Sequence, residues 1–249
     1  MIPKKIHYVW FGNEKNKLMK RCIDSWKKLN YEVYEWNEKT YDINKNDFVK
    51  EAYKKQNWAF LSDYIRLDVL YNLGGIYIDT DVLLIKKIDD NLLDTDVIIG
   101  FQFDCLLGTH FIGTKSKSLF IKSLFIKSFL DKYNNYKEGE SFIVNNHIFN
   151  DFFLENIVDF KLNGKSQQLK YKNERISIYN KNYFGCPKIL GNGYAYHMLD
   201  NSWRKENYKK MKNLFKLIIG DRVYYNLIAY KALKISPYYI KYKNDVVKK

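Results

Sequence analysis

The sequence predicts an α/β fold followed by a basic helical extension at the C-terminus. A strand, a helix and a second strand succeed one another within the first 36 residues. Further on, a long apolar helix ends at two glycines and leads directly into another buried strand. Of the 249 residues, 46% are apolar and 17% aromatic, with only 3 Pro. That composition excludes a disordered or collagen-like chain and indicates a packed globular protein.

The first elements alternate between strand and helix. A buried strand is expected over Ile6–Phe11, a β-branched and aromatic run that ends in a Gly-Asn turn. A second strand is expected over Tyr31–Trp36, where the side chains alternate with a period of two. Between them, Leu18, Cys22 and Trp26 recur at helical spacing.

The central elements continue this pattern. A largely buried helix is expected over Trp58–Leu73, because two glycines end its apolar run. A strand interrupted by two aspartates follows over Ile76–Ile85, and another over Val97–Phe103. The spacing predicts a helix over Leu119–Lys132, whereas Asn134–Gln168 has no clear periodicity.

The last part of the chain is expected to hold two short strands and a helical tail. The strands are predicted at Ile176–Tyr179 and Tyr194–Met198. Helical spacing runs over Arg204–Lys234, and Ser236-Pro237 should end that helix.

The net charge of +14 lies mostly in this tail. Residues 201–249 hold thirteen basic and three acidic residues, a net charge of +10, which leaves +4 for the first 200 residues. Only five of the 42 basic residues are arginine, and no DNA- or RNA-binding motif is visible. We therefore expect no nucleic-acid partner.

The cysteines and the apolar runs indicate the compartment. Cys22, Cys105 and Cys186 are odd in number and far apart, so neither a disulfide framework nor a zinc site is expected. No signal peptide and no transmembrane run is visible. The expectation is a cytoplasmic protein, either free or peripheral on the inner face of the cell membrane.

Two carboxylates follow the strand after the double glycine. If Ile76–Ile78 is a central strand, Asp79 and Asp81 lie on one side at its carboxyl end, where α/β sheets bind ligands. A hard divalent cation takes such oxygen ligands and is completed by substrate phosphates. Acid pairs are also common in surface turns, but a buried strand and a glycine-ended helix precede this one.

The preceding helix carries a second polar pair. Asp63 and Arg66 are three residues apart, so they share a helix face and form either an ordinary ion pair or part of a binding site. In a site, Asp63 would accept from ribose hydroxyls and Arg66 would face a phosphate.

These motifs together resemble the sugar-binding DXD region of a retaining glycosyltransferase family, glycosyltransferase family 32. That family includes capsular-polysaccharide transferases and the fungal initiating mannosyltransferase and, more distantly, the glucosylating domain of large bacterial toxins. The matching segments occur in the family's order and span roughly residues 1–203; they are Ile2–Gly12, Ser62-Asp63-x-x-Arg66 with Leu70, Gly74–Asp81, Tyr196-His197 and Ser202-Trp203.

The resemblance implies a fold and a domain division. The expected fold is a GT-A type, single Rossmann-like domain with a central mixed sheet over residues 1–203. Residues 204–249 would form a basic amphipathic helical tail outside it.

The resemblance also implies donor-binding residues. Trp10 matches a tryptophan that stacks on the nucleobase in the toxins, although a core tryptophan on a buried strand is an alternative. Ser62, Asp63 and Arg66 match the region that contacts ribose and phosphate.

The metal ligands and a closing loop are implied in the same way. Asp81 would bind Mn²⁺ or Mg²⁺ directly, Asp79 would be shared between metal and ribose, and His197 is either a third ligand or a structural histidine. Ser202 and Trp203 match a loop that closes over the donor and excludes water. Asp79, Asp81 and Arg66 would form the catalytic group, because they stabilise charge on the departing diphosphate.

The expected function is therefore metal-dependent, retaining transfer of a hexose from a nucleotide-diphosphate sugar. A UDP-sugar is favoured over a GDP-sugar, and the acceptor would be a glycan or lipid-linked saccharide in bacterial surface polysaccharide synthesis. The tail would lie on an anionic membrane or present a solvated basic face while packed on the domain. The alternatives are a sugar nucleotidyltransferase and a non-catalytic basic protein that binds membrane surfaces.

Overall fold

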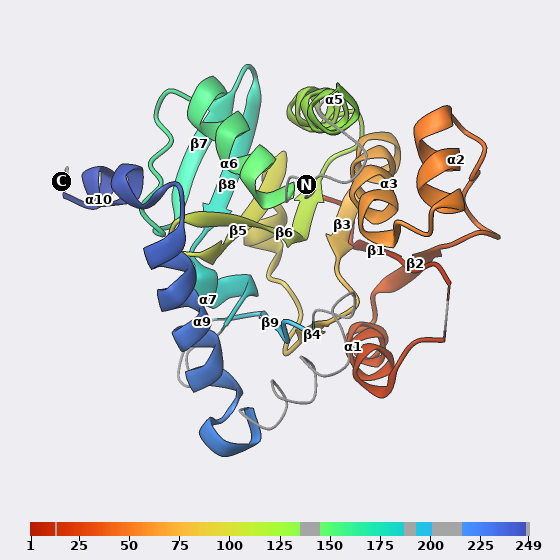
Figure 1. The fold of residues 1–249 in the computed structure, drawn as a ribbon, viewed down its shortest axis with the longest axis horizontal. Helices are drawn as coiled ribbons and strands as arrows, with labels where there is room; N and C mark the ends of the chain where they lie inside the picture. Colours follow the sequence, from red (N-terminus) through yellow and green to blue (C-terminus); the bar gives the residue numbers. More distant parts are fainter. Residues whose placement is uncertain (13, 135–144, 187–192, 201–215, 248–249) are drawn as a thin grey trace.

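A mixed β-sheet lies between two layers of helices (Figure 1) in the computed structural model, which describes residues 1–12, 14–134, 145–186, 193–200 and 216–247. Within these residues the sheet has seven strands in the order β2-β1-β3-β6-β5-β8-β7. Their bounds are β1 Lys5–Val9, β2 Glu32–Trp36, β3 Gly75–Ile78, β5 Val97–Phe103, β6 Leu106–Thr114, β7 Gln167–Tyr171 and β8 Glu174–Tyr179.

The strand directions make the sheet mixed. Strand β1 runs parallel to both β2 and β3, and β5 runs parallel to β8. The β3–β6, β5–β6 and β7–β8 pairs are antiparallel. The predicted α/β class with a central mixed sheet and a helical C-terminal part is confirmed.

Alternating side chains divide the core between the two faces of this sheet. In β3, Tyr77 packs on one face, whereas Ile76 and Ile78 pack on the other. The Tyr77 face, the upper one in Figure 1, is covered by α2 (Asp47–Lys54), α3 (Trp58–Leu73), α5 (Leu119–Asn134) and α6 (Asn145–Asn156). The other face packs against α1 (Lys17–Lys28) and α7 (Lys181–Phe184), and a short helix, α4, spans Asp90–Leu93.

Helix α3 has the predicted bounds, and Gly74 sets the geometry by which it passes into β3. Gly74 has a φ of 65°, a left-handed value that L side chains adopt rarely. A Cβ there would lie 2.6 Å from the Ser116 backbone nitrogen. Glycine is therefore required for β3 to follow α3 directly.

The expected strand Ile76–Ile85 is in fact two strands in two sheets. After β3 the Asp79 amide still donates to the His110 carbonyl on β6 at 3.0 Å, and the chain then turns, with the Val82 amide donating to the Asp79 carbonyl at 3.0 Å. The second half, β4 (Val82–Leu84), pairs antiparallel with β9 (Ala195–His197). Both aspartates therefore lie in the turn between the two sheets.

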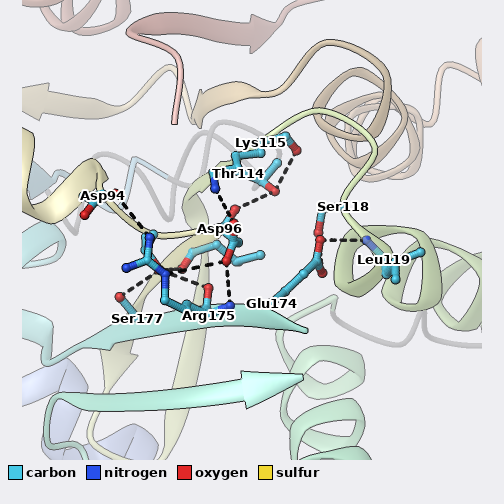
Figure 2. A network of polar contacts seen from close by, with 11 residues as sticks. Asp94, Asp96, Thr114, Lys115, Ser118, Leu119, Glu174, Arg175 and Ser177 are labelled. Carbon is cyan, nitrogen blue, oxygen red and sulfur yellow. Dashed lines mark hydrogen bonds and ion pairs between the residues drawn. The ribbon is translucent and has the colours of Figure 1, made fainter. Parts of the chain in front are cut away.

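A polar network joins the opposite edge of the sheet to α5 (Figure 2). Asp96, just before β5, accepts from the Lys115 ammonium and, at 2.7 Å, from the Arg175 amide. Glu174, at the start of β8, accepts from the backbone amides of Leu119 at 3.0 Å and Phe120 at 2.7 Å. These amides lie in the first turn of α5, so Glu174 caps that helix from another strand.

The C-terminal helices pack on the rest of the fold. Helix α9 (Asp221–Ile235) buries Tyr225 and Ala229 beside Phe103 of β5, and α10 (Tyr239–Val247) follows the predicted break. The expected helical residues 204–215 lie outside the described part of the chain. Within the described part, none of the helices is both long enough and apolar enough to cross a membrane.

Candidate functional site

The two aspartates of the DXD motif lie at the carboxyl end of β3. The ligand atoms of Asp79, Asp81 and His197 all lie within 4.8 Å of one another. The aspartates are half-buried and His197 is buried. Asp79 and Asp81 are the predicted metal ligands, and His197 is expected to be either a third ligand or a structural histidine; the fold brings the histidine to the aspartates from more than a hundred residues away.

The short sheet of β4 and β9 is what brings His197 to the aspartates. His197 pairs with Val82 in that sheet, directly after Asp81. The Asp81 side chain accepts from the Asp200 amide at 2.7 Å and lies 3.4 Å from His197 Nε2. Burial would raise the pKa of Asp81, but the neighbouring His197 imidazole and these hydrogen bonds hold it well below its usual range. Asp81 is therefore a carboxylate at neutral pH.

Asp79 lies between Arg66 and the other two members of the cluster. Arg66 Nη2 is 3.2 Å from Asp79 Oδ1 and 3.4 Å from Asp63 Oδ1. Burial and the nearby Asp81 carboxylate raise the pKa of Asp79, and the Arg66 guanidinium opposes that rise. The ion pair that the Asp63-x-x-Arg66 spacing suggested is present, and Arg66 extends it to the DXD motif.

The Arg66 side chain is itself fixed by the sheet. It is buried, its Nη1 donates to the Thr109 carbonyl on β6 at 2.7 Å, and the guanidinium lies 4.4 Å from the centre of the Tyr77 ring. Strands β3 and β6 thus fix the position of the guanidinium that faces the carboxylates of Asp63 and Asp79.

His110 is a member of the site that is not among the predicted site residues. Its ring stacks on the His197 ring at a centroid distance of 4.2 Å, and its Nε2 lies 3.2 Å from the Phe184 carbonyl. Burial and the neighbouring His197 hold the pKa of His110 well below its usual range, so His110 is neutral. A Cβ on Gly108 would lie 2.5 Å from the His110 ring, which explains the glycine there. A lone histidine in an apolar stretch gives no sequence signal for this contact.

Asn145 is a second residue that is not among the predicted site residues. It begins α6, is buried, and its Nδ2 donates to Asp63 Oδ1 at 3.1 Å. Asn145 falls in the stretch that had no clear periodicity, so the sequence did not indicate that it reaches the α3 face.

Several buried polar atoms around the cluster have no hydrogen-bond partner among the described residues. They are Arg66 Nε, His110 Nδ1, His197 Nδ1 and Asn145 Oδ1. Buried polar atoms are normally satisfied, so such a group around one cluster indicates a bound polar ligand. Two carboxylates with an imidazole suit Mn²⁺ or Mg²⁺ coordination, completed by phosphate oxygens. The residues present therefore fit a divalent cation with an anionic co-ligand.

The other predicted residues lie in different positions. Trp10 directly follows β1, and because β1 and β3 are parallel, it lies at the same sheet edge as Asp79. Its side chain is partly buried against the α1 side of the core. The Ser62 hydroxyl donates to the Ala59 carbonyl within α3 at 3.0 Å. Ser202 and Trp203 lie outside the described residues.

Comparison with known proteins identifies one region of the chain. Residues 12–99 match the family described as glycosyltransferase sugar-binding region containing DXD motif. This region includes Asp63, Arg66, Asp79 and Asp81. The similarity to this family thus covers the Asp63–Arg66 pair and the Asp-x-Asp motif beside His197.

Two individual proteins are also similar. Subversion of eukaryotic traffic protein A of Legionella pneumophila is 25% identical over 120 residues, covering 36% of this chain and 19% of that protein. The match spans about a fifth of that relative's length. Among solved structures, PaToxG glycosyltransferase is similar with a TM-score of 0.49 and 18% identity, over 62% of this chain and 69% of that one.

Proposed function

We propose that this protein is a metal-dependent retaining glycosyltransferase that transfers a hexose from a nucleotide-diphosphate sugar to a saccharide or lipid-linked acceptor. The observation that carries the proposal is the Asp79, Asp81 and His197 cluster within reach of the buried Arg66. A UDP-sugar is the favoured donor, and bacterial surface polysaccharide synthesis is the favoured setting.

The residues around the cluster have different proposed roles, which follow from the chemistry of their side chains. Asp79, Asp81 and His197 would hold Mn²⁺ or Mg²⁺, which supplies charge neutralisation at the donor diphosphate when bound. Asp81 is the principal ligand, because it is ionised and clamped by the Asp200 amide. Arg66 favours the charged form of Asp79 and leaves its Nε for a donor oxygen.

Further donor contacts follow from position. We assign Trp10 to the nucleobase, because it lies at the Asp79 edge of the sheet. Asp63 is assigned to donor hydroxyls beside Asn145, whose buried Oδ1 has no partner among the described residues. Ser62 lies at the same helix turn, and Ser202 and Trp203 remain the proposed closing loop, where exclusion of water would favour transfer over hydrolysis.

In the proposed organisation, residues 1–203 form the catalytic domain. Residues 204–249 place that domain at a membrane surface. The net charge of +10 in residues 201–249 supports a peripheral position on the inner, anionic face of a cell membrane. A lipid-linked acceptor would be presented at that surface.

The test is donor hydrolysis and thermal stabilisation with a panel of UDP- and GDP-sugars in Mn²⁺ or Mg²⁺. We expect one nucleotide sugar to raise the melting temperature and to be hydrolysed slowly, and chelation of the metal to remove both effects. No response to any sugar nucleotide would contradict the proposal.

Asp81→Asn should abolish metal-dependent hydrolysis, because an amide cannot replace the ionised ligand, while the far-UV circular dichroism stays unchanged. Asp94→Asn is the matched control, since Asp94 is an exposed carboxylate paired with Arg175 outside the cluster. Full activity in Asp81→Asn, or equal losses in both variants, would refute the assignment of Asp81.

A sugar nucleotidyltransferase is the second candidate, because it would also need acidic metal ligands on an α/β sheet. It would consume a nucleoside triphosphate and a sugar 1-phosphate and release pyrophosphate. Incubation with those two substrates separates the candidates: pyrophosphate release without donor hydrolysis would favour the nucleotidyltransferase. A non-catalytic surface-binding protein would respond in neither assay.

A further inference from the structure

Helix α9 has two faces of opposite character. Its inner face buries Tyr225 and Ala229 against β5, where the Tyr225 hydroxyl donates to the Gln102 carbonyl. Its outer face leaves Val223, Leu227 and Tyr230 between 52% and 62% exposed. These three residues are four and three positions apart, so they form one continuous apolar stripe along the helix.

Basic side chains lie next to this stripe. Arg222, Lys231 and Lys234 are exposed on the same helix. Lys231 follows Leu227 by one turn, and Lys234 follows Tyr230 by one turn, with its ammonium 5.5 Å from the Tyr230 ring centre. Lys234 thus lies alongside the apolar stripe rather than away from it.

The acidic residues of the two terminal helices do not offset this charge. Residues 216–247 contain Asp221 and Asp245 as their only acids. Asp221 lies 3.3 Å from the Lys216 ammonium, and Asp245 is buried and lies 2.8 Å from the Lys241 ammonium. The outer face of α9 is therefore apolar and basic.

We propose that the outer face of α9 is the surface by which this protein lies on an anionic lipid bilayer. An exposed apolar stripe with adjacent basic residues suits the boundary between acyl chains and headgroups. A tyrosine at its edge suits the same depth, since its ring is amphipathic. The proposal rests on the peripheral membrane location proposed above, but not on the donor chemistry. It places the membrane contact on α9, outside the lysine-rich segment 205–216.

Contacts of the inner face of α9 determine where a bilayer on its outer face would lie relative to the site. Gln102, which accepts from Tyr225, also bonds through its Oε1 to Asn146 Nδ2 at 2.9 Å, next to Asn145. At its other end, the segment before α9 is tied to the site by Lys216, which donates to the Met198 carbonyl directly after His197. A bilayer on the outer face would lie one helix diameter from these contacts, on the side away from the sheet.

The test is flotation of the full chain with phosphatidylcholine vesicles, with and without phosphatidylserine. We expect binding only to the anionic vesicles and weaker binding as salt rises. Lys231→Gln with Lys234→Gln should weaken vesicle partition by about 30-fold, and Leu227→Glu should abolish it. Donor hydrolysis and unfolding midpoint should remain at wild-type values in both, because these side chains are exposed on the outer face.

Matched controls lie elsewhere on the surface. Lys27→Gln with Lys28→Gln removes two exposed lysines from α1, and Val158→Glu places a charge on a side chain that is fully exposed. Both should bind vesicles like the wild type. Equal losses in the control and α9 variants, or wild-type binding by Leu227→Glu, would overturn the proposal.

Light scattering gives a further decisive outcome. A wild-type dimer that Leu227→Glu converts to a monomer would assign the face to a second copy of the chain, against the proposal. An inactive but vesicle-binding wild-type protein would refute the proposed function while supporting the membrane surface.

Discussion

His110 shows how a side chain outside the predicted metal ligands can determine whether those ligands work. Its ring stacks on the His197 ring, and its own position is fixed by the Phe184 carbonyl and by the lack of a side chain at Gly108. Because His110 is neutral, it adds no positive charge beside the cluster. We therefore regard it as a positioning residue for His197.

Replacing His110 by alanine should lower the Mn²⁺ affinity of the protein by roughly 10- to 100-fold, as the loss of a supporting residue at metal sites typically does. Isothermal titration with Mn²⁺ measures this directly. Turnover should recover at saturating Mn²⁺, which loss of the fold would not permit. Gly108→Ala should act in the same direction, since its Cβ would displace the His110 ring.

His147→Ala is a suitable control for these two variants, because the His147 ring packs on Tyr238 of the segment before α10. It should leave the Mn²⁺ affinity unchanged. A wild-type affinity in His110→Ala would show that His197 needs no support from the neighbouring ring.

At the scale of elements, local signals predicted the elements whose apolar runs have clear ends. Helix α3 and strand β5 were predicted with their observed bounds, because an apolar run with clear ends marks each. Strand β6 was missed, since its nine residues are nearly all buried and show no alternation. Helix α6 was missed because three of its asparagines are buried together with most of its apolar residues, so no amphipathic period appears.

The site was predictable where it depends on neighbours in sequence. Asp79 and Asp81 follow a buried strand, and Asp63 and Arg66 share a helix face, so spacing brought each pair together and the resemblance assigned both pairs to a donor site. His197 came only from the resemblance, and Asn145 and His110 had no assigned role in the site. These three reach the cluster through strand pairing and helix packing, which spacing does not encode.

Asp96→Asn tests the network that joins β5, β6 and β8 in Figure 2. Burial would raise the pKa of Asp96, but the hydrogen bonds from Lys115 and the Arg175 amide outweigh it and lower that pKa. The stabilisation is therefore present above the ordinary carboxyl pKa and is lost as pH falls through the lowered one. At pH 7 the variant should lose about 1–3 kcal/mol of unfolding free energy.

Urea unfolding across a pH series measures this difference. The gap between wild type and variant should be full at pH 7 and should shrink below about pH 4, where the wild-type carboxylate also becomes protonated. A gap that stays constant down to pH 2 would mean that the ionised form of Asp96 contributes nothing.

At the scale of the whole molecule, the C-terminal helices are part of the packed structure. Tyr225 of α9 packs with Phe103, and Asp245 of α10 accepts from the Leu162 amide at 2.8 Å. Deleting everything after residue 203 would therefore expose core surface as well as remove positive charge. Point substitutions on the outer face of α9 are the better way to separate location from folding.

Tyr225→Ala should cost about 3–5 kcal/mol of unfolding free energy, because it removes a fully buried ring. Tyr225→Phe keeps the ring and loses only the hydrogen bond to Gln102, at a cost near 1 kcal/mol. Chemical denaturation of both variants checks the ranking. Equal stability of Tyr225→Ala and wild type would mean that α9 is not integrated into the cooperative unit.

Because β4 pairs with β9, the residues of the cluster are synthesised at different times. During translation, Asp79 and Asp81 leave the ribosome long before His197, and the amide that clamps Asp81 arrives 119 residues after it. The sheet strands β1, β3, β5 and β6 all precede residue 115 and can associate before that point. The residues of these four strands are thus available to pair before the proposed metal cluster can be complete, because His197 and Asp200 emerge later.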